Sequence, residues 1–215
     1  MMKALILGGG VIQQKELSYC LSQGIDIVIA ADRGLEAAEN FNLNIDEAVG
    51  DFDSISTKSF AYWKEKGIPI YRYPSSKDES DMELAFALAS QKGCKEIYLL
   101  GALAGRVDHE LANLFLLLKG HQQGICCKML NQQNCLYFVH SSHCFLKKET
   151  YGDYFSFFAF SPQVSALTLS GFCYPMMKKN LYFGDFYTIS NILEAEEGFC
   201  FFQDGTLLCV ESRDE

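Results

Sequence analysis

The sequence lacks the motifs of several common enzyme classes. It has no GxxxxGK[ST], no GxSxG and no HExxH pattern, which excludes a P-loop kinase, a nucleophile-elbow hydrolase and a zincin-type zinc hydrolase. No apolar run approaches the roughly 18 residues that a membrane-spanning helix needs. The first ten residues, MMKALILGGG, lead directly into a strand-like segment, so we expect no signal peptide.

Positive charge is also scarce. The 215 residues include 18 Lys and Arg against 27 Asp and Glu, a net charge of -9. Non-specific binding to nucleic acid or to an anionic membrane depends on cations, so we expect neither partner. An acidic chain of this kind suits a protein that gathers Mg²⁺ with carboxylates.

Cysteine is present, but not in a pattern that indicates disulfides. The nine cysteines are odd in number and irregular in spacing, and they contain no CxxC pair. We interpret them as reduced and mostly buried thiols of a cytoplasmic protein, with a scattered zinc site as the less favoured alternative.

Strand and helix signals alternate over the first part of the chain. Short apolar runs, typical of buried parallel strands, are separated by amphipathic segments that stop at glycine, such as Gly67, Gly93 and Gly120. We therefore predict an α/β domain over residues 1–133 with a doubly wound, mostly parallel sheet. The expected strands are 3–7, 26–31, 47–50, 68–73, 96–100 and 126–130, and the expected helices 17–23, 35–41, 57–66, 81–92 and 110–119.

From residue 134 to 215 the pattern changes to period-2 alternation with few helix signals. The alternating segments 136–139, 154–160, 164–169 and 199–202 predict a second, all-β domain of the sandwich or jelly-roll type. Residues 201–210 read as a hairpin with Asp204 and Gly205 in its turn.

Aspartates follow several predicted strands of the first domain. In an open parallel sheet, ligands bind beyond the carboxyl ends of the strands, so acids that are distant in sequence should meet at one edge. Clustered carboxylates repel one another and require a cation, and Mg²⁺ is the usual one for a phosphorylated substrate. The acids in question are Asp32, Asp51, Asp53, Asp78, Asp81 and Asp108.

Each aspartate taken alone also has a purely structural interpretation. Asp51 and Asp53 fit an ordinary turn, and Asp78 and Asp81 fit a helix start, where Ser80 and Glu83 form a capping box. For Asp108 the alternative is a salt bridge with Arg106. Because these aspartates are expected to meet at one sheet edge, we favour the functional interpretation over the structural one.

Other polar residues lie among these acids. Lys77 and Arg106 are suited to neutralising phosphate oxygens. His109 and Asn113 are four residues apart on one predicted helix face, where a packed histidine is the commoner case and Asn113 needs a polar partner.

Four segments together resemble the thiamine pyrophosphokinase family in order and spacing: AADRG (30–34), GDFDS (50–54), KDESDMELA (77–85) and GRVDHELAN (105–113). In the second domain, GFCYPMMKKNLYFG (171–184) followed by ISN (189–191) is similar to that family's thiamine-binding segment. The resemblance covers nearly the whole chain and is weaker in the second domain.

The resemblance implies a homodimer with an N-terminal α/β domain and a C-terminal β-sandwich that converts thiamine and ATP to thiamine diphosphate and AMP with Mg²⁺. It assigns catalysis to Asp51, Asp53, Asp78, Asp81 and Asp108, and the first four of these also to the metal. It assigns nucleotide or phosphate binding to Arg106, His109 and Asn113, and we expect Asp32 and Lys77 to take part in the same binding. It assigns thiamine binding to Ser190 and Asn191.

The chain departs from the family pattern in three places, one of which is the segment GALAG (101–105), where the family is usually richer in glycine. Arg33 stands where the family usually has glycine, and Ser80 where it usually has threonine. Two other functions stay open on the sequence alone: a pyrophosphokinase with another acceptor alcohol, and a non-catalytic sensor of nucleotide or thiamine diphosphate.

Overall fold

The structure is a computed structural model that describes residues 1–103 and 105–214. It divides into two compact units, Met1–Gln132 and Gln133–Glu215. This division lies one residue before the boundary expected from the sequence.

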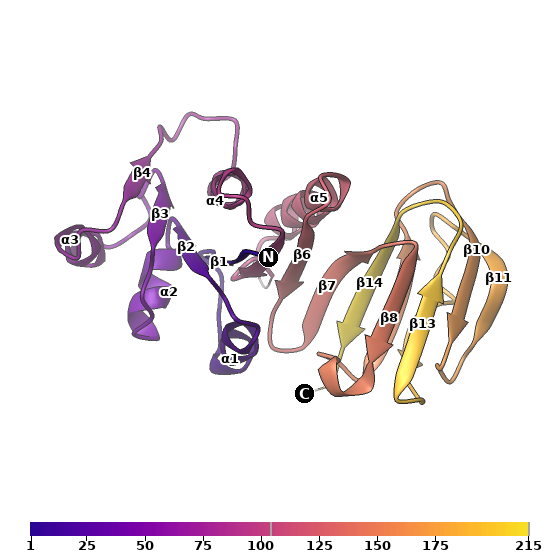
Figure 1. Cartoon of the computed structure of the whole chain (residues 1–215). Coiled ribbons are helices and arrows are strands. Elements are labelled where there is room, and N and C mark those ends of the chain that lie inside the picture. The colour runs from indigo at the N-terminus through magenta and orange to yellow at the C-terminus, as the bar shows by residue number, and fades with distance from the viewer. Residues whose placement is uncertain (104, 215) are drawn as a thin grey trace. The chain divides into compact units, whose positions relative to one another are not determined.

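The sheet of the first unit has the order β6-β5-β1-β2-β3-β4, and all its neighbouring strands are parallel (Figure 1). β2 is buried at every position, as a strand covered on both faces requires. The strands are β1 (Lys3–Leu7), β2 (Ile27–Ala31), β3 (Glu47–Gly50), β4 (Ile70–Arg72), β5 (Glu96–Leu100) and β6 (Cys126–Leu130).

Helices cover both faces of this sheet, so the predicted doubly wound fold is confirmed. In Figure 1, α4 and α5 lie above the sheet and α1 and α2 below it. The helices are α1 (Gln14–Ser22), α2 (Gly34–Asn40), α3 (Thr57–Glu65), α4 (Asp81–Gln91) and α5 (Val107–Gln122).

Local capping chemistry sets the ends of α3 and α4. The hydroxyls of Ser56 and Ser80 accept hydrogen bonds from the backbone N–H groups of Ser59 and Glu83 at 3.2 and 3.1 Å. Both side chains are therefore N-caps, and they satisfy donors that a helix start leaves free.

The predicted end of α5 at Gly120 is wrong. The helix continues to Gln122, and Gly120 lies inside it. A Cβ atom at Gly120 would come 2.4 Å from the Cys127 Sγ of β6, so glycine serves close packing of helix on strand here. The glycine that follows the helix is Gly124, which has a φ of 68°.

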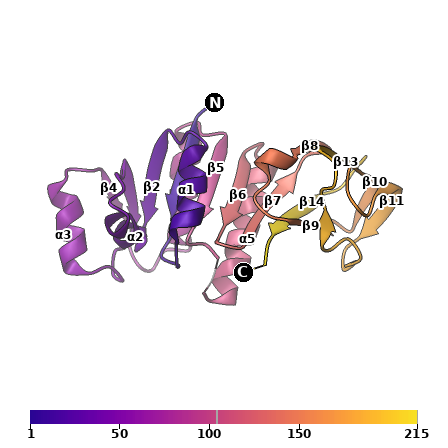
Figure 2. The same cartoon turned by 90° about the horizontal axis from the view of Figure 1, so that it is seen from below.

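The second unit packs two antiparallel sheets, β12-β9-β14-β7 and β11-β10-β13-β8 (Figure 2). The predicted all-β sandwich is confirmed. The elements are β7 (Asn134–Val139), β8 (Ser142–Leu146), the short helix η1 (Lys147–Glu149), β9 (Tyr154–Ala159), β10 (Gln163–Ser170), β11 (Met176–Tyr182), β12 (Asn191–Ile192), β13 (Glu197–Phe201) and β14 (Leu207–Ser212).

An aromatic cluster joins the two sheets. The ring of Phe145 on β8 lies 5.3 Å from that of Phe155 on β9 and 5.6 Å from that of Phe172, centroid to centroid. Edge-to-face contacts of this kind fill the sandwich core and add stability beyond area burial.

The hairpin predicted over residues 201–210 is wrong. β13 pairs with β8 and β10, whereas β14 pairs with β7 and β9 in the other sheet. Two alternating strands flanking Asp204-Gly205 look like a hairpin, but the connection crosses between sheets. Gly205 has a φ of 114° and lies against the backbone of Gln163 and Val164, so the turn depends on tertiary contact.

All nine cysteines are free thiols, and most of them are buried. Within the described residues, no helix combines the length and apolarity needed to cross a bilayer.

Candidate active site

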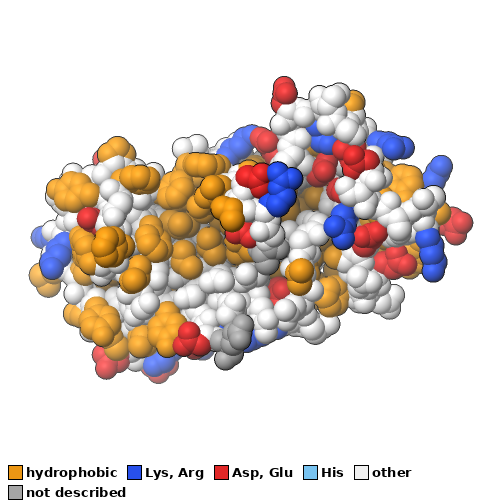
Figure 3. Space-filling model, turned by 180° about the vertical axis from the view of Figure 1, so that it is seen from behind, with side chains coloured by type: hydrophobic (Ala, Val, Ile, Leu, Met, Phe, Trp, Pro, Cys, Tyr) orange, Lys and Arg blue, Asp and Glu red, His pale blue; other side chains and the backbone are white. Residues whose placement is uncertain are grey.

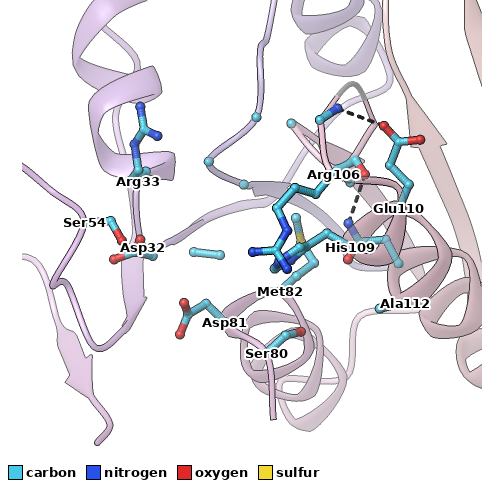
Figure 4. Close-up of a pocket in the computed structure, with 18 of the residues that line it drawn as sticks. Asp32, Arg33, Ser54, Ser80, Asp81, Met82, Arg106, His109, Glu110 and Ala112 are labelled. Atoms are coloured by element: carbon cyan, nitrogen blue, oxygen red, sulfur yellow. Dashed lines mark hydrogen bonds between the residues drawn. The ribbon is translucent and has the colours of Figure 1, made fainter. Parts of the chain in front are cut away.

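A cavity of about 850 Å³ opens beyond the carboxyl ends of β1, β2, β3 and β5. Its volume suits a nucleotide-sized ligand. Figure 4 shows Asp32 and Asp81 on one side of this cavity and Arg106 and His109 on the other. The predicted residues among its lining are Asp32, Asp51, Lys77, Asp81, Arg106, His109 and Asn113.

The turn after β3 separates Asp51 from Asp53. Phe52 between them is buried, contacts the ring of Phe60 at 5.2 Å and has a φ of 59°. This left-handed kink directs Asp51 toward the cavity and leaves Asp53 exposed. The backbone N–H of Asp53 donates to Asp51 Oδ1 at 3.1 Å, and this bond holds the pKa of Asp51 below its usual value.

Asp32 follows β2 in a left-handed conformation with a φ of 45°. Its backbone N–H donates to the carbonyl of Val49 at 2.9 Å, which ties it to β3. Its Oδ1 atom is buried with no hydrogen-bond partner among the described residues. Desolvation by burial, followed by the charge of Asp81, raises the pKa of Asp32.

Asp32, Asp51 and Asp81 form a carboxylate trio, with one oxygen from each lying within 4.8 Å of the others. They come from the ends of β2 and β3 and the start of α4. The open parallel topology thus brings together acids up to 49 positions apart, as expected for this sheet edge.

The trio fits a hard divalent cation. It offers only carboxylate oxygens, and the unpartnered Oδ1 of Asp32 is a ligand atom that the protein leaves unused. Mg²⁺ takes oxygen ligands from one or two carboxylates together with waters and substrate phosphates. Asp51 and Asp81 were predicted as metal ligands, and Asp32 was predicted only to bind nucleotide.

Lys77 lies directly beside the trio. Its Nζ atom is 2.9 Å from Asp81 Oδ1 and 3.8 Å from Asp51 Oδ2, and its side chain is only 10% exposed. Burial lowers the pKa of the Lys77 ammonium, but the hydrogen bond and charge of Asp81 and the charge of Asp51 outweigh this, and the net shift is upward. The ammonium therefore stays charged at neutral pH.

Asp53 and Asp78 lie outside the trio. Both are exposed, and neither lines the cavity. Asp53 Oδ1 accepts a hydrogen bond from the hydroxyl of Ser54 at 2.8 Å. Their catalytic and metal roles stay predictions.

The start of α5 supplies the other side of the cavity. Arg106 donates to both carboxylate oxygens of Asp108, at 3.1 Å to Oδ1 and 2.5 Å to Oδ2, and both side chains are mostly exposed. Arg106 lowers the pKa of Asp108. Asp108 is not a lining residue, so its observed contact is the salt bridge considered as the alternative.

Asn113 finds its polar partner in the loop after β5. Its Nδ2 donates to the carbonyl of Ala102 at 2.9 Å, and the side chain is buried. Asn113 thereby fixes the loop that forms one wall of the cavity, and His109 lies one turn earlier on the same lined face.

Glycines let two loops meet at the cavity floor. The N–H of Gly10 donates to the carbonyl of Gly101 at 3.0 Å, and that of Gly8 to the carbonyl of Leu100 at 2.8 Å. A Cβ on Gly10 would come 2.5 Å from the Gly101 oxygen. The glycine run after β1 therefore permits close backbone approach, although it lacks a dinucleotide fingerprint.

Arg33 lies at the rim and turns away from the trio (Figure 4). Its Nε is 3.4 Å from Glu36 Oε2, and the other oxygen of Glu36 accepts the Ser56 N–H at 2.9 Å. The side chain at this unusual position is therefore part of a contact between α2 and the loop before α3.

The two predicted thiamine-binding residues, both in the second unit, differ in their exposure to solvent. Ser190 is exposed, with a φ of 54°. Asn191 is buried, and its amide bonds the backbone of Tyr174 in both directions, at 3.0 Å as acceptor and 2.9 Å as donor. Asn191 holds the Tyr174 segment beside Ser190, and both assignments to thiamine stay predictions.

The sequence placed Asp32 among the acids expected to meet at this sheet edge but assigned it to nucleotide binding, whereas the structure places it beside Asp51 and Asp81. The available signal was its position directly after β2, the same placement as Asp51 after β3. Ser75 and Glu79, which also line the cavity, were not among the predicted site residues, although Glu79 lies within the segment KDESDMELA.

Comparison with known proteins identifies the family. Residues 20–129 match the family model "Thiamin pyrophosphokinase, catalytic domain", and residues 142–207 match "Thiamin pyrophosphokinase, vitamin B1 binding domain". The chain is 31% identical over 186 residues to thiamine pyrophosphokinase of Bacillus subtilis, covering 86% of this chain and 87% of that protein.

Solved structures give the same result. The crystal structure of the Bacillus subtilis enzyme has a TM-score of 0.89 at 28% identity, covering 99% of this chain and all of that one. That of thiamin pyrophosphokinase from Geobacillus thermodenitrificans has a TM-score of 0.85 at 27% identity, covering 100% and 99%. The chain therefore belongs to the thiamine pyrophosphokinase family.

Proposed function

We propose that this protein transfers a pyrophosphoryl group from ATP to the hydroxyl of thiamine, producing thiamine diphosphate and AMP. The observation that carries the proposal is the carboxylate trio at one wall of a nucleotide-sized cavity, with Arg106 and His109 at another. This arrangement provides both charges that the transfer needs: carboxylates for a metal and the guanidinium of Arg106 for phosphates.

Asp32, Asp51 and Asp81 would hold Mg²⁺, which when bound neutralises phosphate charge and polarises the transferred group. Lys77 and Arg106 contribute further positive charge toward the phosphates. His109 contacts the nucleotide from α5, and Asn113 keeps the loop after β5 in place through the Ala102 carbonyl. Positioning and charge stabilisation then supply most of the catalysis.

In the reaction, the thiamine hydroxyl oxygen forms a bond to the β-phosphorus of ATP as the bond from that phosphorus to the α,β-bridging oxygen breaks. AMP leaves with the bridging oxygen, and the hydroxyl proton passes to a carboxylate. Asp78 and Asp81 are the two candidates for this base.

Two variants separate the candidates. In Asp81→Asn, the loss of a metal ligand should raise the Mg²⁺ concentration needed for half-maximal rate. In Asp78→Asn, the loss of a base should lower kcat at unchanged Mg²⁺ dependence. The reverse pattern would exchange the two roles.

The second unit would bind thiamine. Ser190 presents an exposed hydroxyl, and Tyr174, which Asn191 positions, presents an exposed ring suited to a flat cation. Phe186 and Tyr187 are further exposed aromatic candidates in the same unit.

A homodimer is part of the proposal. Apolar side chains gather over the second unit, in the left half of Figure 3. Single exposed apolar residues are common, but so many in one unit favour an interface. The exposed ones include Tyr174, Met177, Tyr182, Phe183, Phe186, Tyr187, Ile189, Ile192, Phe199 and Phe201.

The decisive assay mixes the purified chain with ATP, Mg²⁺ and thiamine and follows AMP by chromatography. AMP and thiamine diphosphate should appear in equal amounts, and only in the complete mixture. Asp53→Asn should abolish turnover in a folded protein; full activity would remove Asp53 from the site. AMP formation with another alcohol but not thiamine would indicate a different acceptor, and ligand binding without AMP would indicate a sensor.

A further inference from the structure

The ammonium of Lys77 pairs with two of the carboxylates that are proposed to hold Mg²⁺. Its ammonium is 2.9 Å from Asp81 Oδ1 and 3.8 Å from Asp51 Oδ2, the carboxylates assigned to the cation. These contacts are not a loose surface pair, because the Lys77 side chain is 10% exposed and that of Asp51 14%. The trio already has a cation of its own.

We propose that Lys77 is a competing counter-ion, which the metal displaces from Asp51 and Asp81 and which then pairs with the phosphates of the bound nucleotide. The inference rests on the proposed function and goes beyond it, because it couples metal affinity to nucleotide affinity through one side chain. Lys77 acts as a positioning residue and takes no part in bond making.

The competition follows from the distances. Mg²⁺ binds oxygen at about 2.0–2.1 Å, so an ion held by the trio would use the two carboxylate groups, those of Asp51 and Asp81, that also pair with the ammonium. A divalent ion and an ammonium at such separations repel each other strongly in a partly buried site. Within the described part of the chain, Asp32, the third member of the trio, forms no ion pair with Lys77, and its Oδ1 has no hydrogen-bond partner.

The destination of the displaced ammonium follows from its surroundings. Lys77 lines the cavity that Arg106 and His109 also line. A bound nucleotide brings phosphate oxygens into this cavity, and they can replace the carboxylate oxygens that Lys77 loses. A phosphate-rich ligand therefore favours the metal, and the metal favours the ligand, as linkage requires.

The test measures Mn²⁺ binding to the full chain without nucleotide, by calorimetry or electron paramagnetic resonance. Lys77→Met should bind Mn²⁺ about tenfold more tightly than the wild type, since a competing cation is gone. Lys58→Met is the matched control: it removes the same charge from an exposed position on α3 and should bind Mn²⁺ as the wild type does. Lys77→Gln repeats the test with a polar side chain in case the Met variant does not fold.

The second measurement is of nucleotide affinity, which the same substitution should lower rather than raise. At saturating Mn²⁺, Lys77→Met should bind α,β-methylene-ATP about tenfold more weakly, because a phosphate partner is lost. A purely structural role for Lys77 would weaken both ligands together. Unchanged or weaker Mn²⁺ binding in Lys77→Met overturns the competition, and unchanged nucleotide affinity overturns the transfer to phosphates.

Asp81→Asn distinguishes failure of this inference from failure of the metal site itself. If Asp81→Asn binds Mn²⁺ more weakly while Lys77→Met is unchanged, the site stands and the Lys77 inference falls. If wild type, Asp81→Asn and Lys77→Met all bind Mn²⁺ alike, the metal lies elsewhere and both fall. The AMP assay reports the proposed reaction independently of these binding results.

Discussion

At the scale of single residues, the site consists of side chains held in positions that cost stability. Asp32 combines a left-handed backbone, partial burial and two neighbouring carboxylates. Such arrangements persist where function requires them. Gly50, the last residue of β3 before Asp51, is also constrained, since a Cβ there would lie 3.2 Å from Asp32.

Asp32→Asn should stabilise the metal-free protein at pH 7 by about 0.5–1 kcal/mol, because it removes a repelling charge and asparagine accepts a positive φ. The folded protein raises the pKa of Asp32 above its ordinary 3.8, so the native state binds this proton more tightly than the unfolded state does. The contribution of Asp32 to the stability of the wild type therefore falls as pH rises past 3.8, and the advantage of the Asn variant over the wild type grows with it.

Urea unfolding between pH 4 and pH 7 in chelator measures this difference. Asp153→Asn, which removes an exposed acid in the second unit, serves as the control and should leave stability nearly unchanged. A gain for Asp32→Asn that is independent of pH would show that backbone conformation, not charge, causes it.

Neighbouring Ser190 and Asn191 should separate ligand binding from stability. Ser190→Gly removes the exposed hydroxyl without strain at its positive φ, so it should raise the KM for thiamine severalfold and leave stability nearly unchanged. Asn191→Leu loses two part-buried hydrogen bonds to Tyr174 and should destabilise the fold by about 2–3 kcal/mol.

Steady-state kinetics and urea unfolding of both variants give the comparison. A large rise in KM for Asn191→Leu in a protein of full stability would instead make Asn191 a direct thiamine ligand.

At the scale of elements, close packing overrides local preference in α5. Alanine is favoured over glycine in a helix interior, yet Gly120→Ala should destabilise the protein by about 1–3 kcal/mol, because the new methyl would meet Cys127 Sγ. The double variant with Cys127→Ala should recover part of the loss. Thermal unfolding measures both, and a stabilised Gly120→Ala would mean that the helix shifts freely on β6.

Close packing also determines the residue type where the loops after β1 and β5 meet at the cavity floor. Gly10→Ala forces apart the hydrogen bond between Gly10 and the Gly101 carbonyl, so we expect the KM for ATP to rise about tenfold or more. Gly105→Ala is the control, since a Cβ at Gly105 meets nothing within 4 Å. Equal kinetic effects in the two variants would remove any special role from the floor contact.

At the scale of the whole molecule, the exposed aromatic surface of the second unit predicts association. Light scattering should give about twice the chain mass of 24.2 kDa for the wild type. The double variant Phe183→Ser/Phe186→Ser should shift it toward monomer, because both side chains are exposed apolar surface. Val107→Ser, an exposed site on α5, should not. A monomeric wild type at micromolar concentration would contradict the homodimer.

The secondary structure, the fold class and the clustering of aspartates could be predicted from the sequence, because they depend on local interactions and on periodic patterns of apolar residues. Apolar runs such as 96–100 define parallel strands, Ser56 and Ser80 define helix starts, and aspartates directly after strands must meet at one sheet edge. The family followed from the same residues, since GDFDS and GRVDHELAN combine an unusual chemistry with a particular spacing.

Features that depend on contacts between residues distant in sequence could be seen only in the tertiary structure. Period-2 alternation could not tell whether β13 and β14 share a sheet, and a glycine after an apolar run could not tell a helix end from the contact of Gly120 with Cys127. Nor could spacing show that Asp51 faces the cavity while Asp53 does not line it, because burial of Phe52 between them separates the two side chains. Local sequence patterns are compatible with several strand pairings, helix ends and side-chain orientations, and tertiary packing selects one of them.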